Sequence, residues 1–149
     1  IDSSGPALAT AMGNLALNPQ LDESLAEWRE ADVFNELRVL RKEGQRFDLV
    51  ILDPPKFAPS AAYAERAARA YRDINAFGFR LLNPGGLLMT YSCSGGIRSE
   101  HFQQIVADAA VGAGCEGRIL RRLAAPPDHP VALHFSEGEY LKGLLCQVD

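Results

Sequence analysis

Two short apolar segments constrain the fold of this chain most strongly. Phe47–Leu52 (FDLVIL) and Leu87–Ser92 (LLMTYS) each have the length and the apolar content of a buried parallel β-strand. Between them, Ala61–Leu82 shows the periodic apolar stripe of a long helix, which we expect the sequence NPGG at 83–86 to end. A strand, a helix and a second strand in this order predict a βαβ unit, and therefore an α/β fold with a mostly parallel sheet.

The same patterns predict the remaining elements. The predicted helices are Ala7–Leu17, Asn35–Glu43 and Glu100–Gly112, the last capped by Ser99. The predicted strands are a weak one around Leu25–Ala31 and two near the end of the chain, Arg118–Leu123 and Tyr140–Val148. No helical pattern separates the two final strands, so we expect one of them to run antiparallel to the rest of the sheet.

Residues suited to chemistry follow both strands of the βαβ unit. Asp53 comes directly after the first strand and precedes Pro54 and Pro55, whose fixed φ angles and missing N–H donors hold the loop rigid. Cys93 comes directly after the second strand, in a turn of small residues (SCSGG) that we expect to be exposed. If the two strands are parallel neighbours, the carboxylate and the thiol emerge at the same edge of the sheet, where open α/β sheets bind ligands.

The composition excludes several classes of protein. The chain has 149 residues, a formal net charge of −4 and three scattered cysteines, so we expect one domain in a reducing, cytoplasmic setting without a disulfide framework. Its three histidines lack ligand-like cysteine spacing, which gives no sign of a metal site. The sequence has neither an apolar run of about 20 residues nor a basic leader. The acidic balance argues against strong nonspecific binding to nucleic acid, because such binding needs Lys and Arg.

We expect the chain to be a piece of a longer protein because of the way it starts. Ile1-Asp2-Ser3 is typical of the last residue of a strand and the turn into a helix, and no glycine-rich cofactor loop precedes a predicted helix. Residues 1–149 are therefore expected to be the C-terminal portion of a single domain whose N-terminal strands are missing. We expect this portion alone to be unstable or inactive.

The ordered motifs of the chain resemble one family closely. The collinear stretches are IDSSGPAL (1–8), ADVF (31–34), FDLVILDPPKFA (47–58), YRDIN (71–75), LLNPGGLLMTYSCSG (81–95), PPDHP (126–130) and EYLKGLL (139–145). Together they resemble the class I S-adenosylmethionine-dependent methyltransferases, and among these the bacterial large-subunit ribosomal RNA cytosine-5 methyltransferase I family. The resemblance implies a Rossmann-like fold, S-adenosylmethionine as cofactor and ribosomal RNA as substrate. The glycine-rich loop and the RNA-binding domain of that family are absent from this sequence.

The resemblance implies that three carboxylates contact the cofactor. Asp2 would accept hydrogen bonds from the ribose diol, and Asp32 would meet the adenine amino group. Asp53, at the end of the next strand, is expected close to the cofactor as well as to the substrate. Capping of a helix N-terminus is the alternative, purely structural role of Asp2 and Asp32, because aspartate is a favoured capping residue.

The proline loop and the cysteine suit chemistry on a cytosine base. The carbonyls of Pro54 and Pro55 can accept hydrogen bonds from a base, and Phe57 can stack on it. Attack of a Cys93 thiolate on carbon 6 would make carbon 5 nucleophilic, while Asp53 stabilises the charge that develops at ring nitrogen 3. We therefore predict Cys93 and Asp53 as the catalytic pair. The structural alternatives are a plain turn at Asp53 and a packed thiol at Cys93.

Two other functions stay open. An amino-group methyltransferase of nucleic acid also uses an Asp-Pro-Pro loop followed by an aromatic residue, but it needs no cysteine, and here Lys56 separates the loop from the aromatic ring. A noncatalytic module, in which a methyltransferase-like fold only acts as a scaffold or binds RNA, stays open because of the acidic net charge and the missing glycine-rich loop. RNA is the expected partner, no membrane or metal is expected, and a homodimer is left open. Cys115 and Cys146 lack a comparable turn, so we expect both thiols to be packed.

Overall fold

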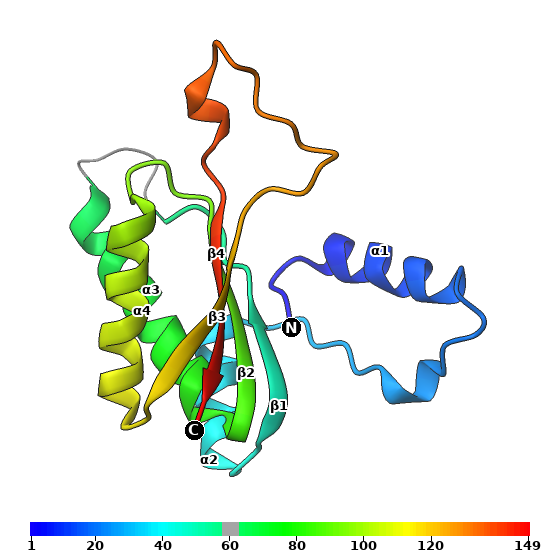
Figure 1. Cartoon of the computed structure of the whole chain (residues 1–149). Coiled ribbons are helices and arrows are strands. Elements are labelled where there is room, and N and C mark those ends of the chain that lie inside the picture. The colour runs from blue at the N-terminus through cyan, green and yellow to red at the C-terminus, as the bar shows by residue number, and fades with distance from the viewer. Residues whose placement is uncertain (58–62) are drawn as a thin grey trace. The chain divides into compact units, whose positions relative to one another are not determined.

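The computed structural model describes residues 1–57 and 63–149 (Figure 1). These residues form two compact units, Ile1–Glu43 and Gly44–Asp149. The first two residues of the predicted helix Ala61–Leu82 and the last residue of the 47–58 motif lie outside the described residues. Among the residues described, no helix combines the length and the apolar content that crossing a membrane requires.

The Ile1–Glu43 unit is built from two helices and a short 3-10 turn. They are α1 (Gly5–Ala16), η1 (Glu23–Leu25) and α2 (Val33–Lys42). Ser4 caps α1, because its side chain accepts a hydrogen bond from the Ala7 N–H. The strand predicted around Leu25–Ala31 is wrong: the segment contributes a single parallel bridge, between Asp2 and Glu30. In a strand, Glu27 and Arg29 would lie on one face and Glu30 on the other, so neither face would be uniformly apolar, which explains why the segment does not extend into a strand.

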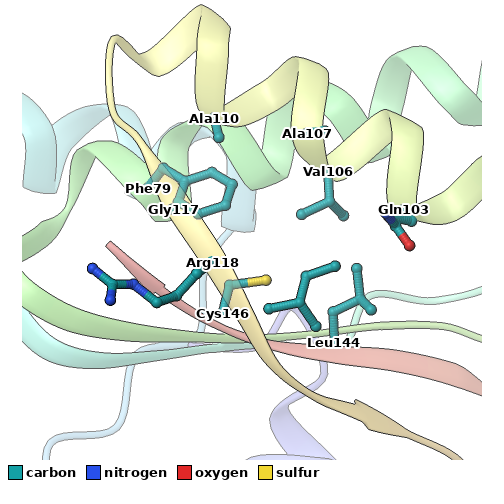
Figure 2. A pocket seen from close by; sticks show the side chains of 10 residues that line it. Phe79, Gln103, Val106, Ala107, Ala110, Gly117, Arg118, Leu144 and Cys146 are labelled. Carbon is teal, nitrogen blue, oxygen red and sulfur yellow. The ribbon is translucent and has the colours of Figure 1, made fainter. Parts of the chain in front are cut away.

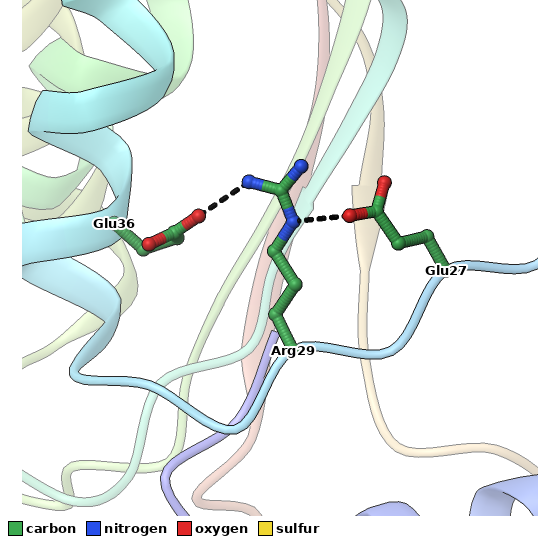
Figure 3. A network of polar contacts seen from close by, with 3 residues as sticks. All are labelled: Glu27, Arg29 and Glu36. Atoms are coloured by element: carbon green, nitrogen blue, oxygen red, sulfur yellow. Dashed lines mark hydrogen bonds and ion pairs between the residues drawn. The ribbon is translucent and has the colours of Figure 1, made fainter.

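A network of ionic hydrogen bonds ties the segment before α2 to that helix (Figure 3). The Arg29 guanidinium donates through Nε to Glu27, at 2.7 Å, and through Nη1 to Glu36 of α2. Hydrogen bonds to Glu27 and then to Glu36 raise the pKa of Arg29. The Arg29 carbonyl in turn accepts a hydrogen bond from the Asp2 N–H, at 3.1 Å, so the network also fixes the backbone beside Asp2.

The Gly44–Asp149 unit is a four-stranded sheet with two helices on one face (Figure 1). Its elements are β1 (Phe47–Leu52), α3 (Ala64–Arg80), β2 (Leu82–Ser92), α4 (Ser99–Ala113), β3 (Gly117–Leu123), η3 (Ser136–Gly138) and β4 (Lys142–Val148). The strand order is β1-β2-β4-β3. β1 pairs with β2 in parallel, whereas β4 runs antiparallel to both β2 and β3. The prediction that one of the two final strands is antiparallel is therefore confirmed, and β4 is that strand.

The core of this unit lies between the sheet and the helices α3 and α4. The predicted inward-facing residues of α4 are all buried: Phe102, Ile105, Val106 and Ala109. On α3, Gly78 allows a close approach to the sheet, since a Cβ at this position would lie 2.9 Å from Leu52 Cδ1. The predicted cap at Ser99 is wrong. Arg98 occupies the N-cap position without a side-chain hydrogen bond, and Ser99 is already helical.

Two features of the strands differ from the predictions. β1 is an edge strand rather than a fully buried one, and Leu49 and Ile51 are 47% and 57% exposed. Among the described residues of this unit, α3 and α4 pack on the Leu52 face of the sheet, whereas Leu49 and Ile51 lie on the opposite face of β1. The NPGG sequence at 83–86 does not end α3, which stops at Arg80; instead it bulges out of β2, between the residues paired with Phe47 and Leu49.

Candidate functional site

The parallel pairing of β1 with β2 brings the predicted catalytic pair to one edge of the sheet. Leu52, the last residue of β1, lies beside Thr90 of β2, and Asp53 follows directly. Cys93 follows the last residue of β2, Ser92, whose antiparallel partner is Lys142 at the start of β4. The condition set by the sequence, two parallel neighbouring strands, is therefore met. The same edge also receives Lys142, a residue to which the sequence assigned no role.

One side chain from α3 links the two segments that carry the predicted residues. The Tyr71 ring contacts the Phe57 ring edge-on, with centroids 4.8 Å apart, and the Tyr71 hydroxyl lies 2.9 Å from Ser94 Oγ. Tyr71 is fully buried, and Asn75 one helical turn later donates to its backbone carbonyl at 2.7 Å. A rigid helix thus holds the loop after β1 and the turn after β2 at once, which suits a site that needs fixed geometry.

The turn that contains Cys93 is packed more tightly than its small residues suggested. Ser92 and Ser94 are fully buried, so the expectation of an exposed turn is wrong for both, whereas Gly95 is exposed. The hydroxyl of Ser92 accepts a hydrogen bond from the Ser94 N–H at 3.3 Å. Because these hydroxyls have partners inside the protein, the serines can be buried. The Cys93 side chain is half-buried between them.

Lys142 is the charged residue at this edge whose role the sequence left open. Its Nζ donates to the carbonyls of Ser94, at 2.7 Å, and of Ile97, at 2.6 Å. Burial lowers the pKa of Lys142, the Cys93 thiol opposes this effect, and the positive charge of Lys56 adds to it. The signal for Lys142 was its position at the start of the final strand, but it becomes meaningful only once β4 is known to pair with β2.

The residues of the proline loop differ in how far they are exposed. Asp53 and Pro55 are exposed, Pro54 is buried and Phe57 is half-buried. The exposed carboxylate and the Pro55 backbone are accessible to a ligand at this edge. Phe57 uses one side of its ring to pack on Tyr71, which also gives it a structural role.

Two of the three carboxylates predicted to bind the cofactor, Asp2 and Asp32, lie in the Ile1–Glu43 unit. Asp2 Oδ1 accepts a hydrogen bond from the Ser4 N–H at 2.7 Å, and Asp32 Oδ1 accepts one from the Asn35 N–H at 2.8 Å. Asp32 therefore has the capping role that was its alternative, whereas Ser4 takes that role at α1. Both side chains are exposed, and an ionised carboxylate accepts about four hydrogen bonds, so each fits the hydroxyls or the amino group of a nucleoside.

The other two cysteines lie away from this edge. Burial raises the pKa of Cys115, and it raises the pKa of Cys146 to about 11. Cys146 lines a cavity of about 310 Å³ between α4 and the strands β3 and β4 (Figure 2). Apart from Gln103 and Arg118, the side chains that line this cavity are apolar or sulfur-bearing, and Arg118 forms an ion pair with Asp149. A protonated thiol in such surroundings is a packing group rather than a nucleophile.

A second cavity lies in the connection between β3 and β4. It measures about 440 Å³ and is lined by the 124–131 loop together with Glu139 and Leu141. Since β3 ends at Leu123 and β4 begins at Lys142, this connection leaves the sheet at the edge that carries Asp53 and Cys93. In residues 1–57 and 63–149, no three His, Cys, Asp or Glu side chains gather in a way that could hold a metal ion.

Comparison with known proteins gives relatives over nearly the whole chain. No family model matches the sequence. The chain is 49% identical, over 148 residues, to the ribosomal RNA large subunit methyltransferase I of Shewanella denitrificans and 50% identical, over 147 residues, to that of Tolumonas auensis. Each alignment covers 99% of this chain and 37% of the relative, so the chain spans little more than a third of the relatives' length.

Solved structures share the fold at lower identity. The proposed methyltransferase SMU.776, solved in complex with SAH, aligns with a TM-score of 0.65 at 21% identity, covering 79% of this chain and 30% of that one. A methyltransferase homologue from Pyrococcus horikoshii aligns with a TM-score of 0.66 at 15% identity, covering 98% of this chain and 51% of that one. These likenesses confirm the predicted α/β, Rossmann-like methyltransferase fold, of which this chain contains a part.

Proposed function

Because the chain is homologous to the ribosomal RNA large subunit methyltransferase I proteins across nearly all of its own length, we propose that it carries catalytic residues of an S-adenosylmethionine-dependent ribosomal RNA methyltransferase. We further propose that the methylated atom is carbon 5 of cytosine. The observation that carries this proposal is the edge of the sheet at which Asp53 follows β1 and Cys93 follows β2. A bacterial ribosomal RNA substrate implies that the enzyme acts in the cytoplasm.

The residues at this edge suit a cytosine that has left its base stack. Such a base can lie against the exposed Asp53 carboxylate and the Pro55 backbone, while the Phe57 ring borders it. Tyr71 of α3 contacts both Phe57 and Ser94 in the Cys93 turn, so this helix fixes the distance between the proline loop and the turn. Extruding the base costs a few kcal/mol in a paired context, a cost that is smallest for an unpaired nucleotide.

The proposed reaction is covalent catalysis by Cys93. The Cys93 thiolate forms a bond to carbon 6 of the base, and a proton shared between Asp53 and ring nitrogen 3 stabilises the negative charge that develops on the ring. The electron pair of the former 5,6 double bond then becomes available at carbon 5. When bound, S-adenosylmethionine supplies an electrophilic methyl group for carbon 5 and becomes S-adenosylhomocysteine. A general base takes the carbon 5 proton, the double bond re-forms, and the Cys93–carbon 6 bond breaks to release the thiolate.

The carboxylates of the Ile1–Glu43 unit have the chemistry that the cofactor's nucleoside requires. Asp2 would accept from the ribose hydroxyls and Asp32 from the adenine amino group, each with the oxygen that its backbone hydrogen bond does not use. Support for the cofactor also comes from the complex of SMU.776 with SAH. The cofactor and the reaction should be tested in the full-length parent protein, because this chain spans only 37% of the length of its relative.

The decisive test compares Cys93 with a second cysteine in the full-length parent. Purified wild type, Cys93→Ala and Cys115→Ala are incubated with unmodified large-subunit ribosomal RNA and S-adenosylmethionine, and the digested nucleosides are identified by mass spectrometry. We expect 5-methylcytidine with wild type and with Cys115→Ala, and none with Cys93→Ala. Formation of an N-methylated nucleoside that survives Cys93→Ala would replace the proposal with an amino-group methyltransferase. Absence of methyl transfer together with retained RNA binding would indicate the noncatalytic module.

A further inference from the structure

Lys142 binds both ends of the 94–97 turn, which directly follows Cys93. Its ammonium group donates to the carbonyls of Ser94 and Ile97, at 2.7 and 2.6 Å, and the Ile97 N–H donates back to the Ser94 carbonyl at 3.1 Å. Ile97 is buried, with 1% of its surface exposed, so the far end of the turn is anchored in the core. The lysine therefore joins the start of β4 to both ends of the short turn that follows the thiol.

The position of Lys142 is determined by the sheet. Lys142 is the first residue of β4 and the antiparallel partner of Ser92, the residue before Cys93. Directly after it, Gly143 lies opposite Tyr91, where a Cβ would come within 2.6 Å of the Tyr91 ring. The absence of a side chain at 143 lets the two strands pair closely, and the pairing holds the ammonium at the level of the turn.

The charges around Lys142 show what the lysine faces. Cys93 on the turn after β2 interacts with it favourably, as a thiolate does with an ammonium, and Lys56 of the proline loop interacts with it unfavourably. From α3, the Tyr71 hydroxyl meets the same turn through Ser94. Two of the three N–H donors of the ammonium bind backbone carbonyls, which fixes the direction of the remaining one. An ammonium that is half-buried in this way is screened less by solvent than a surface charge.

We infer that Lys142 is a positioning residue for Cys93, which fixes the 94–97 turn through two hydrogen bonds and keeps a positive charge beside the sulfur. The inference rests on the proposed function, in which Cys93 attacks the base. A nearby cation favours the thiolate, the reactive form of a cysteine. The last strand of the sheet therefore supplies a cation for the Cys93 turn, and Lys56 is a second, more exposed charge on the loop after β1.

The test separates the charge of Lys142 from its hydrogen bonds. In the full-length parent protein, Lys142→Arg keeps the charge, Lys142→Gln keeps a hydrogen-bond donor without the charge, and Lys142→Met keeps neither. Lys56→Gln is the matched control for loss of a lysine at the same edge. For each protein, the rate at which iodoacetamide alkylates Cys93 is measured by peptide mass spectrometry from pH 6 to 10. This reading needs neither RNA nor cofactor.

The inference makes a defined prediction for these proteins. Loss of a neighbouring cation should slow alkylation of Cys93 at pH 7 about threefold or more in both Lys142→Gln and Lys142→Met. Lys142→Arg should stay close to wild type, and Lys56→Gln should show the smaller change. A Lys142→Gln profile that overlays wild type, or an Arg variant as slow as the Gln variant, would overturn the inference.

Failure of the inference is distinguishable from failure of the proposed function. If Cys93→Ala retains methyl transfer, the proposed role of Cys93 is wrong, whatever the alkylation profiles show. If Cys93→Ala is inactive but the alkylation of Cys93 does not depend on Lys142, the proposed function stands and the role of Lys142 is wrong. Hydrogen exchange of the 142–148 strand in each variant checks that the sheet is intact. If Lys142→Met does not fold, Lys142→Gln still tests the inference, because its amide can donate to the same carbonyls.

Discussion

Removal of one buried hydroxyl should loosen the turn that carries Cys93. The Tyr71→Phe substitution keeps the ring that contacts Phe57 and Phe102 and deletes only the hydroxyl that lies 2.9 Å from Ser94 Oγ. A neutral hydrogen bond of this kind contributes about 1 kcal/mol to stability. If the loss falls on local opening of the turn, about 1 kcal/mol corresponds to an open population about fivefold larger.

Amide hydrogen exchange of the full-length parent measures this effect directly. Peptides covering residues 92–98 should exchange about fivefold faster in Tyr71→Phe than in wild type, whereas peptides from β3 should not change. Tyr140→Phe, at an exposed tyrosine, is the control. Ser94→Ala should have a similar effect, and the double variant should exceed neither single variant by much, because the two changes remove the same interaction. Equal exchange of the 92–98 segment in Tyr71→Phe and wild type would refute the proposed link between α3 and the turn.

Three further predictions concern other residues of the Gly44–Asp149 unit. Gly143→Ala should lower the free energy of unfolding by about 1–3 kcal/mol in urea titrations, because the added Cβ would press on the Tyr91 ring. The control is Gly112→Ala on α4, where the added Cβ meets open space; it should be neutral or stabilise the protein by up to about 1 kcal/mol. Burial raises the pKa of Cys146 to about 11, so as the pH rises the thiol loses its proton in the unfolded chain before it does so in the folded protein. The free energy of unfolding should therefore fall by up to about 1.4 kcal/mol per pH unit between pH about 9 and 11. Cys146→Ala should remove this contribution to the pH dependence. Asp53→Asn should lower kcat for methyl transfer by about 100-fold or more in a radiolabelled-methyl assay. An unchanged kcat would remove Asp53 from the mechanism.

The sequence predicted the elements of the Gly44–Asp149 unit well because their signals are local. The apolar run predicted both ends of β1 correctly. Because no helical pattern separates β3 from β4, the sequence also predicted that one of these two strands runs antiparallel. The residues at the ends of β1 and β2 could be placed at one edge because parallel pairing alone requires it. Such signals depend only on residues close together in the chain, so they can be read from a single sequence.

Other features depend on contacts between distant residues, and the sequence could not supply them. The link from Tyr71 to Ser94 and the hydrogen bonds from Lys142 to the same turn join segments that are 23 and 48 residues apart. The exposure of Leu49 and Ile51 depends on which face of the sheet the helices cover. The strand expected around Leu25–Ala31 is reduced to one bridge, because a weak charged segment becomes a strand only where a neighbour pairs with it along its length.

The central claim is that Cys93 forms a covalent bond to carbon 6 of a cytosine. A 5-fluorocytosine-substituted large-subunit ribosomal RNA tests it, because fluorine cannot leave carbon 5 as a proton does and the enzyme stays attached after methyl transfer. The full-length parent is incubated with this RNA and S-adenosylmethionine, and the product is analysed by denaturing gel and peptide mass spectrometry. The account predicts a cofactor-dependent adduct at Cys93 that is absent from Cys93→Ala. Methyl transfer to unsubstituted RNA without any adduct on the fluorinated RNA would contradict it.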